Sequence, residues 1–141
     1  MDDAAELALL AGSRRILVIG LSKDEFKAAH QIPLYMFSHG YEVVGVNPTV
    51  ASGSVAGMPV YRSLEAVPAG FVPDIIVVFR PSEQAGEAVR RALEAKPAKK
   101  AVWLQLGIKS EQARELAASA GLAFVQDKCI MRERMRLFHE Q

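Results

Sequence analysis

Gly20, Leu21, Ser22 and Lys23 form a segment whose residue types can bind phosphate groups. Gly20 lets the backbone turn sharply and leaves room for a ligand, while exposed N–H groups and the Ser22 hydroxyl can donate to phosphate oxygens. Lys23 and Lys27 add positive charge. Only the first glycine of the Gly-x-Gly-x-x-Gly fingerprint of dinucleotide sites is present. The segment therefore predicts either a phosphate-binding loop or an ordinary tight turn with solvated lysines.

Asn47 is a second polar position, in the sequence Val46-Asn47-Pro48. Dinucleotide-binding folds place an acidic residue here to hold the ribose hydroxyls. Asn47 is neutral and can both donate and accept hydrogen bonds, and Pro48 fixes the direction of the chain. The missing carboxylate argues against NAD and suits a ribose that itself carries a phosphate group, which a carboxylate would repel.

Phe79, Arg80 and Pro81 end another apolar run. An aromatic ring followed by a guanidinium could stack on an adenine or pair with a phosphate. The same residues also fit a core phenylalanine beside a surface arginine that pairs with Glu83. Both interpretations stay open from the sequence.

Five further residues could contact a ligand: Gln105, Gly107, Ile108, Cys129 and His30. Gly107 permits a close approach of the backbone, and the Gln105 amide either faces a ligand or satisfies a neighbouring loop. Cys129 is either an activated thiol at the start of a helix or a small buried hydrophobic residue. His30 is either a ligand contact or a structural hydrogen-bonding group.

The sequence contains no recognisable catalytic set. There is no Ser-His-acid arrangement, no Gly-x-Ser-x-Gly motif and no pair of carboxylates at the predicted strand ends. The three histidines lack the spacing of metal ligands with the single cysteine. These observations predict no metal site and favour a binding protein over an enzyme.

Five short apolar runs, continuous and rich in β-branched residues, predict strands that are buried on both faces, as in a parallel sheet covered by helices. They are 16–20, 42–46, 74–79, 101–105 and 123–126. Helix-like stretches separate them, so we expect an α/β Rossmann-like, doubly wound domain with a mainly parallel sheet of five to six strands. Ligands of such sheets bind beyond the carboxyl ends of the strands, where all the residues above are predicted to lie.

The helices are predicted from apolar spacing and from capping residues. They comprise residues 4–11, a segment with Pro33 in its first turn that ends at Gly40, one capped by Ser82, one from Ser110 to Gly121, and one opening at Cys129. Residues 49–57, rich in Ser, Gly and Ala, are expected to form a mobile loop. Near the end of the chain, the arginines at 132, 134 and 136 are expected to be largely solvated or to pair with Glu133 and Glu140.

The chain has 141 residues, which predicts one domain over 1–141. It carries 17 Lys and Arg against 16 Asp and Glu, so we expect no nucleic-acid partner. No apolar run is long enough to cross a bilayer, and the acidic start Met1-Asp2-Asp3 is unlike a secretory leader. With a single cysteine, these features predict a cytoplasmic protein that is not bound to a membrane.

Five segments in order carry a family resemblance: 18–22 (VIGLS), 39–41 with 46–48 (HGY and VNP), 78–81 (VFRP), 103–108 (WLQLGI) and 127–129 (DKC). Through them the chain resembles the small stand-alone CoA-binding domain proteins, which are similar in turn to the nucleotide-binding domain of the succinyl-CoA synthetase α subunit. The resemblance implies a Rossmann-type fold that binds coenzyme A or acyl-CoA across the carboxyl edge of its sheet.

The resemblance also implies a role for each segment of the site. Gly20, Leu21, Ser22 and Lys23 would cradle the pyrophosphate, Val46, Asn47 and Pro48 would flank the adenosine, and Phe79, Arg80 and Pro81 would close over it. Gln105, Gly107 and Ile108 would lie towards the pantetheine, with Cys129 near its thiol end. Two residues depart from the family pattern: Thr49 replaces a residue that is often basic, and Arg134 follows Glu133 where the family usually has histidine.

Three functions remain open at this point. The first is a non-catalytic protein that binds, carries or senses coenzyme A or acyl-CoA. The second is an enzyme that binds NAD(P) or another adenine nucleotide. The third is an interaction domain with a vestigial site and a protein partner, or a homodimer.

Overall fold

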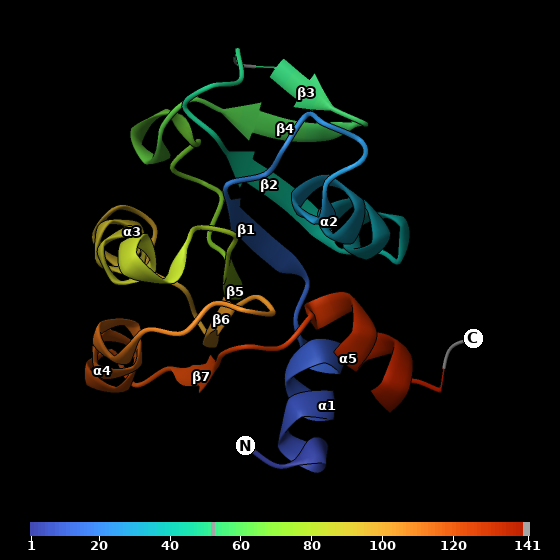
Figure 1. Cartoon of the computed structure of the whole chain (residues 1–141), viewed down its shortest axis with the longest axis vertical. Helices are drawn as coiled ribbons and strands as arrows, with labels where there is room; N and C mark the ends of the chain where they lie inside the picture. The colour runs from blue at the N-terminus through green and yellow to red at the C-terminus, as the bar shows by residue number, and fades with distance from the viewer. Residues whose placement is uncertain (52, 140–141) are drawn as a thin grey trace.

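The computed structural model describes residues 1–51 and 53–139, and within them seven strands form one sheet in the order β3-β4-β2-β1-β5-β6-β7 (Figure 1). Only the β3–β4 pair is antiparallel. The strands are β1 (Arg15–Ile19), β2 (Glu42–Val46), β3 (Gly53–Val55), β4 (Met58–Tyr61), β5 (Ile75–Val78), β6 (Ala101–Leu104) and β7 (Ala123–Val125). All five predicted strands are confirmed as β1, β2, β5, β6 and β7.

Helices cover both faces of the sheet, and every strand except β3 contributes side chains to two cores by alternation. On β1, Ile16 and Val18 pack towards one face, and Leu17 and Ile19 towards the other. In Figure 1 the helices α1, α2 and α5 lie on one side of the sheet, with α3 and α4 on the other. The helices are α1 (Asp3–Gly12), α2 (Ala28–Ser38), α3 (Ser82–Ala95), α4 (Glu111–Ser119), α5 (Ile130–Leu137) and the short 3-10 helix η1 (Leu64–Ala66).

The sheet has more strands than the five to six predicted, because residues 53–61 form a hairpin within the segment expected to be a mobile loop and just beyond it. Ala56 and Gly57 both have positive φ angles, of 51° and 89°, and make the tight turn between β3 and β4. The strands are short, and Pro59 lies inside β4, which hides the strand pattern in the sequence. Ser52, part of the same predicted loop, lies outside the described residues.

Helix α2 begins at Ala28, five residues before Pro33, so the prediction that Pro33 lies in its first turn is wrong. Pro33 has no N–H to donate to the carbonyl of Ala29, four residues earlier. That carbonyl instead accepts a hydrogen bond from the backbone N–H of Ser22, at 3.0 Å. The proline therefore frees a carbonyl that holds the loop between β1 and α2.

The structure confirms the other predicted helix ends described here, with one exception. Ser110 caps α4 by accepting from the N–H of Ala113 at 3.1 Å, and Gly40 and Gly121 follow α2 and α4 with positive φ angles. Ser82 is not the cap of α3, since it is the first helical residue and Pro81 precedes it. The Ser82 hydroxyl instead accepts from the backbone N–H of Lys109, at 3.0 Å, and so ties the loop after β6 to α3.

Helix α5 is anchored to the end of β6 by two buried side chains. The indole N–H of Trp103 donates to the carbonyl of Lys128 at 2.8 Å, and the side-chain carbonyl of Gln105 accepts from the N–H of Ile130 at 2.9 Å. Gln105 therefore satisfies a backbone donor of the first turn of α5. No helix in the described part of the chain has the length and apolar character needed to cross a membrane.

A buried carboxyl joins α1 to α5. Glu6 is 1% exposed, and its Oε1 lies 3.1 Å from Nζ of Lys128. Arg136 pairs with Glu133 at 2.9 Å and with Asp3 at 2.9 Å, while Glu140, another predicted partner, lies outside the described residues. Burial and the nearby carboxyl of Glu133 raise the pKa of Glu6, whereas Arg136 lowers the pKa of Glu133. The helix contact thus contains one carboxyl with a raised pKa beside another with a lowered pKa.

We expect the free energy of unfolding of Glu6→Gln to increase, relative to that of the natural protein, as the pH rises. A raised folded-state pKa gives stability that is present below the ordinary glutamate pKa of about 4.3 and is lost at higher pH, whereas glutamine does not titrate. Urea unfolding of both proteins between about pH 4 and pH 8 measures the difference in free energy. The exposed Glu115→Gln on α4 is the control, and a flat difference for Glu6→Gln would contradict the prediction.

Candidate functional site

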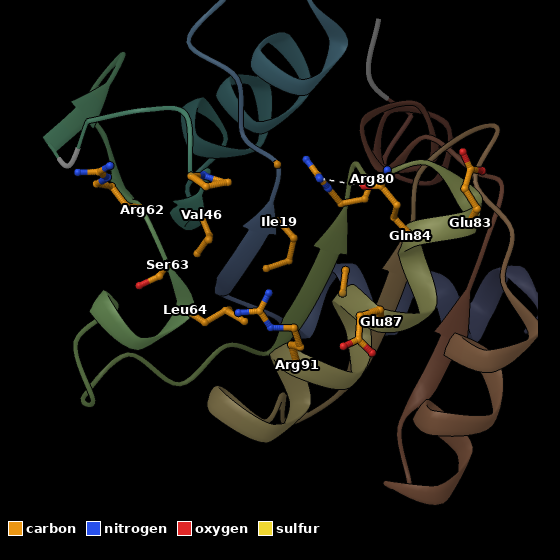
Figure 2. A pocket seen from close by; sticks show the side chains of 13 residues that line it. Ile19, Val46, Arg62, Ser63, Leu64, Arg80, Glu83, Gln84, Glu87 and Arg91 are labelled. Carbon is orange, nitrogen blue, oxygen red and sulfur yellow. Dashed lines mark hydrogen bonds between the residues drawn. The ribbon is translucent and has the colours of Figure 1, made fainter.

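A cavity of about 570 Å³ opens at the carboxyl ends of β1, β2 and β5 (Figure 2). Strand β1 has β2 on one side and β5 on the other, and the helices that follow β1 and β5 cover opposite faces. The order of the strands reverses at this point, which creates the crevice where such sheets bind ligands. The volume lies within the range of about 300–1,000 Å³ that small-molecule sites occupy.

The cavity has an apolar floor and a polar rim. The floor comes from two strand ends, the segment after β2 and two helices: Ile19, Val46, Pro48, Leu64 and Ala88. Polar and charged side chains from three segments form the rim: Arg62, Ser63, Arg80, Glu83, Gln84, Glu87 and Arg91. Such a combination suits a ligand with a flat, weakly polar part and an anionic part.

Three arginines of the rim come from three different elements. Arg62 directly follows β4, Arg80 follows β5, and Arg91 lies in α3 (Figure 2). Arg80 donates to the side-chain carbonyl of Gln84 at 2.9 Å, which holds its guanidinium beside the start of α3. Hydrogen bonds from Arg90, with Nε at 2.7 Å, lower the pKa of Glu87. The Glu87 carboxylate is thereby engaged by an arginine outside the cavity.

The loop after β1 is seated by Leu21, which is fully buried. Leu21 packs over Gly45 of β2, where a Cβ atom would lie only 2.7 Å from the Leu21 side chain. Gly20 has a φ of 97°, and its N–H donates to the carbonyl of Val46 at 2.8 Å. The glycine at 45 therefore provides the space that brings the predicted phosphate-binding loop to the end of β2.

Asn47 fastens this loop to the segment that follows β2. Its side-chain N–H donates to the carbonyl of Leu21 at 2.9 Å. Its side-chain oxygen accepts from the backbone N–H and from the hydroxyl of Thr49, at 2.9 and 2.8 Å. Both lone pairs of this oxygen are therefore occupied within the protein.

His30 holds the loop from the α2 side. It is 7% exposed, and its Nδ1 lies 2.8 Å from the carbonyl oxygen of Ser22. A carbonyl only accepts, so this nitrogen carries the hydrogen. Together with the Ser22–Ala29 hydrogen bond, this contact makes His30 a support of the loop.

The structure brings part of the predicted site together around the cavity. Gly20, Val46, Pro48 and Arg80 line it. Leu21, Ser22, Asn47 and Thr49 belong to the two joined loops, and Lys23 and Lys27 are exposed on the first of them.

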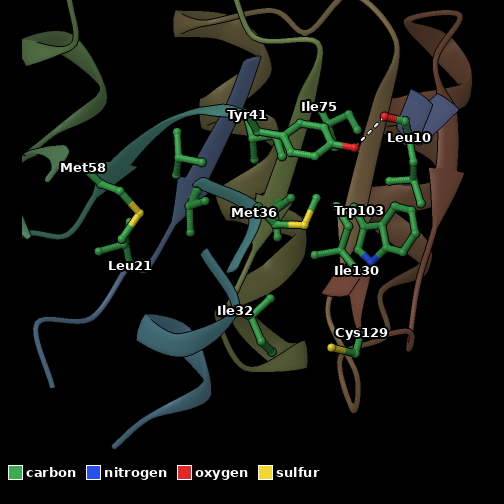
Figure 3. Close-up of a cluster of buried hydrophobic side chains, with 14 of the residues drawn as sticks. Leu10, Leu21, Ile32, Met36, Tyr41, Met58, Ile75, Trp103, Cys129 and Ile130 are labelled. Atoms are coloured by element: carbon green, nitrogen blue, oxygen red, sulfur yellow. Dashed lines mark hydrogen bonds between the residues drawn. The ribbon is translucent and has the colours of Figure 1, made fainter. Parts of the chain in front are cut away.

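The remaining predicted residues do not line the cavity. Phe79 packs against the core on the α2 side, and Pro81 precedes α3. Gly107 donates to the Asp127 carboxylate at 2.7 Å and Ile108 accepts from the Asp127 N–H, which joins the loops after β6 and β7. Cys129 is 7% exposed and lies in the hydrophobic core, directly before α5 (Figure 3).

Nine cavity residues were not predicted as site residues from the sequence: Arg62, Ser63, Leu64, Ile19, Glu83, Gln84, Glu87, Ala88 and Arg91. The first three follow β4, whose strand pattern is concealed, as described above. On α3, Gln84, Ala88 and Arg91 recur at helical spacing on one face, a signal that is present in the sequence.

Two other features bear on the predicted chemistry. Arg134 lies by a separate hollow at the amino ends of β1 and β2, where its guanidinium stacks over Phe138 at 4.2 Å. This departure from the family pattern therefore leaves the cavity unchanged. Within residues 1–51 and 53–139, no group of three or more His, Cys, Asp or Glu side chains could hold a metal ion.

Comparison with known proteins gives consistent matches along most of the chain. Residues 14–135 match the protein family described as the CoA binding domain. An uncharacterized protein of Bacillus subtilis, YneT, is 32% identical over 122 residues, which are 86% of each chain.

Solved structures agree in fold over nearly the whole length. A protein from Thermus thermophilus has a TM-score of 0.87 and 34% identity, covering 98% of this chain and 100% of its own. A hypothetical protein from Pyrococcus horikoshii has a TM-score of 0.86 and 29% identity, covering 98% of this chain and 93% of its own.

We expect Gly45→Ala to destabilise the protein by about 1–3 kcal/mol, because the new methyl group would displace Leu21 and the loop it seats. Urea unfolding measures the loss in free energy. Gly70→Ala is the matched control: it has no heavy atom within 4 Å of the new Cβ, and its effect should stay within about 0.5 kcal/mol. Equal stabilities for the two variants would show that Leu21 does not occupy this space.

Proposed function

The chain belongs to the CoA-binding domain family, and on that premise we propose that its cavity binds coenzyme A or acyl-CoA. The observation that carries the proposal is an apolar floor ringed by arginines at the reversal point of the sheet, beside the loop that follows β1. We infer that the protein binds, carries or senses the cofactor in the cytoplasm and does not transform it.

The adenosine part fits the apolar floor. Ile19, Val46 and Leu64 offer a surface on which a flat base can lie, and Ala88 leaves room for it on α3. Arg91 reaches from α3 towards Leu64 in Figure 2, so its guanidinium is placed to cover a ring bound there. The rim residues Arg80 and Gln84 then lie beside the ribose and phosphates.

The pyrophosphate fits the loop of residues 20–27. Lys23 and Lys27 are exposed there, and Lys27 precedes α2 without a capping hydrogen bond from its side chain. The N–H groups of His30 and Gln31 donate to the Lys27 carbonyl, which leaves those of Ala28 and Ala29 to face anionic oxygens at the positive end of the helix dipole. Hydrogen bonds from Ser22, His30 and Asn47 fix the loop before any ligand arrives.

The pantetheine arm would run from this loop along the carboxyl edge towards Gly107 and Ile108. Asp127 holds the turn at Gly107, and Leu106 beside it is 59% exposed. An exposed apolar side chain suits contact with the arm or with an acyl group. Gln105 and Cys129 would support this end from within the core.

The cavity favours coenzyme A over NAD. Asn47 stands where a carboxylate would hold the ribose hydroxyls of NAD, and its side-chain oxygen is occupied by Thr49. We infer a binding role over catalysis because the residues that line the cavity include no Ser-His-acid or Cys-His combination that would activate a nucleophile.

We expect coenzyme A to raise the melting temperature, and Ala88→Phe to abolish the rise by filling the space for the base. At a ligand concentration of 100 Kd the stabilisation should be about 2.7 kcal/mol. Thermal unfolding with coenzyme A, acetyl-CoA, NAD and ADP measures it. The matched control is Ala118→Phe on the exposed face of α4, which should keep the full rise.

Two results would contradict the proposal. No rise at saturating coenzyme A would exclude binding. An undiminished rise in a folded Ala88→Phe protein would place the ligand outside this cavity.

A further inference from the structure

We propose that Arg62 binds the 3′-phosphate of coenzyme A. Arg62 directly follows β4, the strand beside β2, and it provides the positive charge that the segment after β2 lacks. This inference rests on the proposed function, since it concerns the same cavity. Coenzyme A carries a phosphate on its ribose that dephospho-CoA lacks, and a residue that contacts this group sets the preference between the two ligands.

The sheet register places Arg62 beside the end of β2. Strands β2 and β4 are parallel, with Val46 opposite Tyr61. The N–H of Asn47 then donates to the carbonyl of Tyr61 at 2.9 Å. Arg62 is the next residue of the chain, directly after β4. Neighbouring strands lie about 4.8 Å apart. Its backbone is therefore adjacent to Asn47 and Pro48.

The end of β2 is where a ribose phosphate would lie. Nucleotides bound in this type of crevice place their ribose at the second strand, and an arginine nearby accommodates a phosphate on that ribose. Thr49, on the segment after β2, is uncharged, and its hydroxyl donates to Asn47. A cation at this place must therefore come from another element.

Arg62 is suited to the role by its surroundings. It lines the cavity together with Ser63, and no described carboxylate forms an ion pair with it, whereas Arg90 pairs with Glu87 and Glu94 on the outer face of α3. In Figure 2 Arg62 lies beyond Val46 on the β4 side, while Arg91 lies on the α3 side near Leu64. A guanidinium binds phosphate with two parallel hydrogen bonds, which gives the preference a geometric basis.

The test is calorimetric titration of the natural protein and four variants (Arg62→Gln, Arg62→Lys, Arg91→Gln and Arg114→Gln) with coenzyme A and dephospho-CoA. We expect the natural protein to bind coenzyme A roughly tenfold more tightly than dephospho-CoA. Arg62→Gln should remove this preference and leave the affinity for dephospho-CoA unchanged, and Arg62→Lys should restore part of it. Arg114→Gln is the control for net charge, because Arg114 pairs with Glu111 on α4 and does not line the cavity.

The outcomes separate the two proposals. Equal binding of both ligands by the natural protein, or an unchanged preference in Arg62→Gln, would overturn the role of Arg62 and leave coenzyme A binding intact. Loss of the preference in Arg91→Gln instead would assign the phosphate to α3 and also overturn it. Failure of the folded natural protein to bind coenzyme A or adenosine 3′,5′-bisphosphate would overturn both proposals.

Discussion

Leu21 packs into the space that Gly45 leaves on β2, and the position of the whole β1–α2 loop depends on this contact. Once Leu21 is seated, its carbonyl meets the Asn47 side chain, and Ser22 reaches Ala29 and His30 on α2. These contacts use buried or half-buried polar groups that would be costly to leave unpaired. The loop is therefore ordered by the protein itself, which reduces the entropy that a ligand must overcome.

The contacts of β1 and β5 differ between the amino and the carboxyl ends of the sheet. At the amino end, the Asp74 carboxylate accepts from the N–H groups of Arg14 and Arg15 at 2.8 and 2.9 Å, which closes the start of β1 onto β5. Burial acts to raise the pKa of Asp74, but these backbone donors outweigh it and the pKa is lowered. At the carboxyl end, β1 and β5 lead into chains that diverge to opposite faces. This divergence leaves the cavity at the carboxyl end, whereas the hydrogen bonds of Asp74 close β1 onto β5 at the amino end.

The strands buried on both faces and the helix ends at Ser110, Gly40 and Gly121 could be predicted because each follows from local residue types. The hairpin of β3 and β4 could not, since Pro59 interrupts the pattern and pairing with β2 makes the strand. The start of α2 was missed for a similar reason: a proline inside a helix is tolerated here because Ser22 satisfies the freed carbonyl. Of the residues at the predicted strand ends, Gly20, Val46, Pro48 and Arg80 line the cavity, whereas Arg62 depends on the unpredicted β4.

The arginines of the cavity show why sequence distance is a poor guide to such a site. Arg62, Arg80 and Arg91 stand on three elements and converge only because β4 and β5 lie on opposite sides of the β2–β1 pair. Charges at the rim of an apolar floor attract anions more strongly than charges in open water. Under the proposed function, the floor would take an uncharged ring and the rim would take the phosphates. A nucleotide bound in the reverse direction would then place its charged groups on Ile19 and Leu64, so the proposal implies a preferred direction of binding.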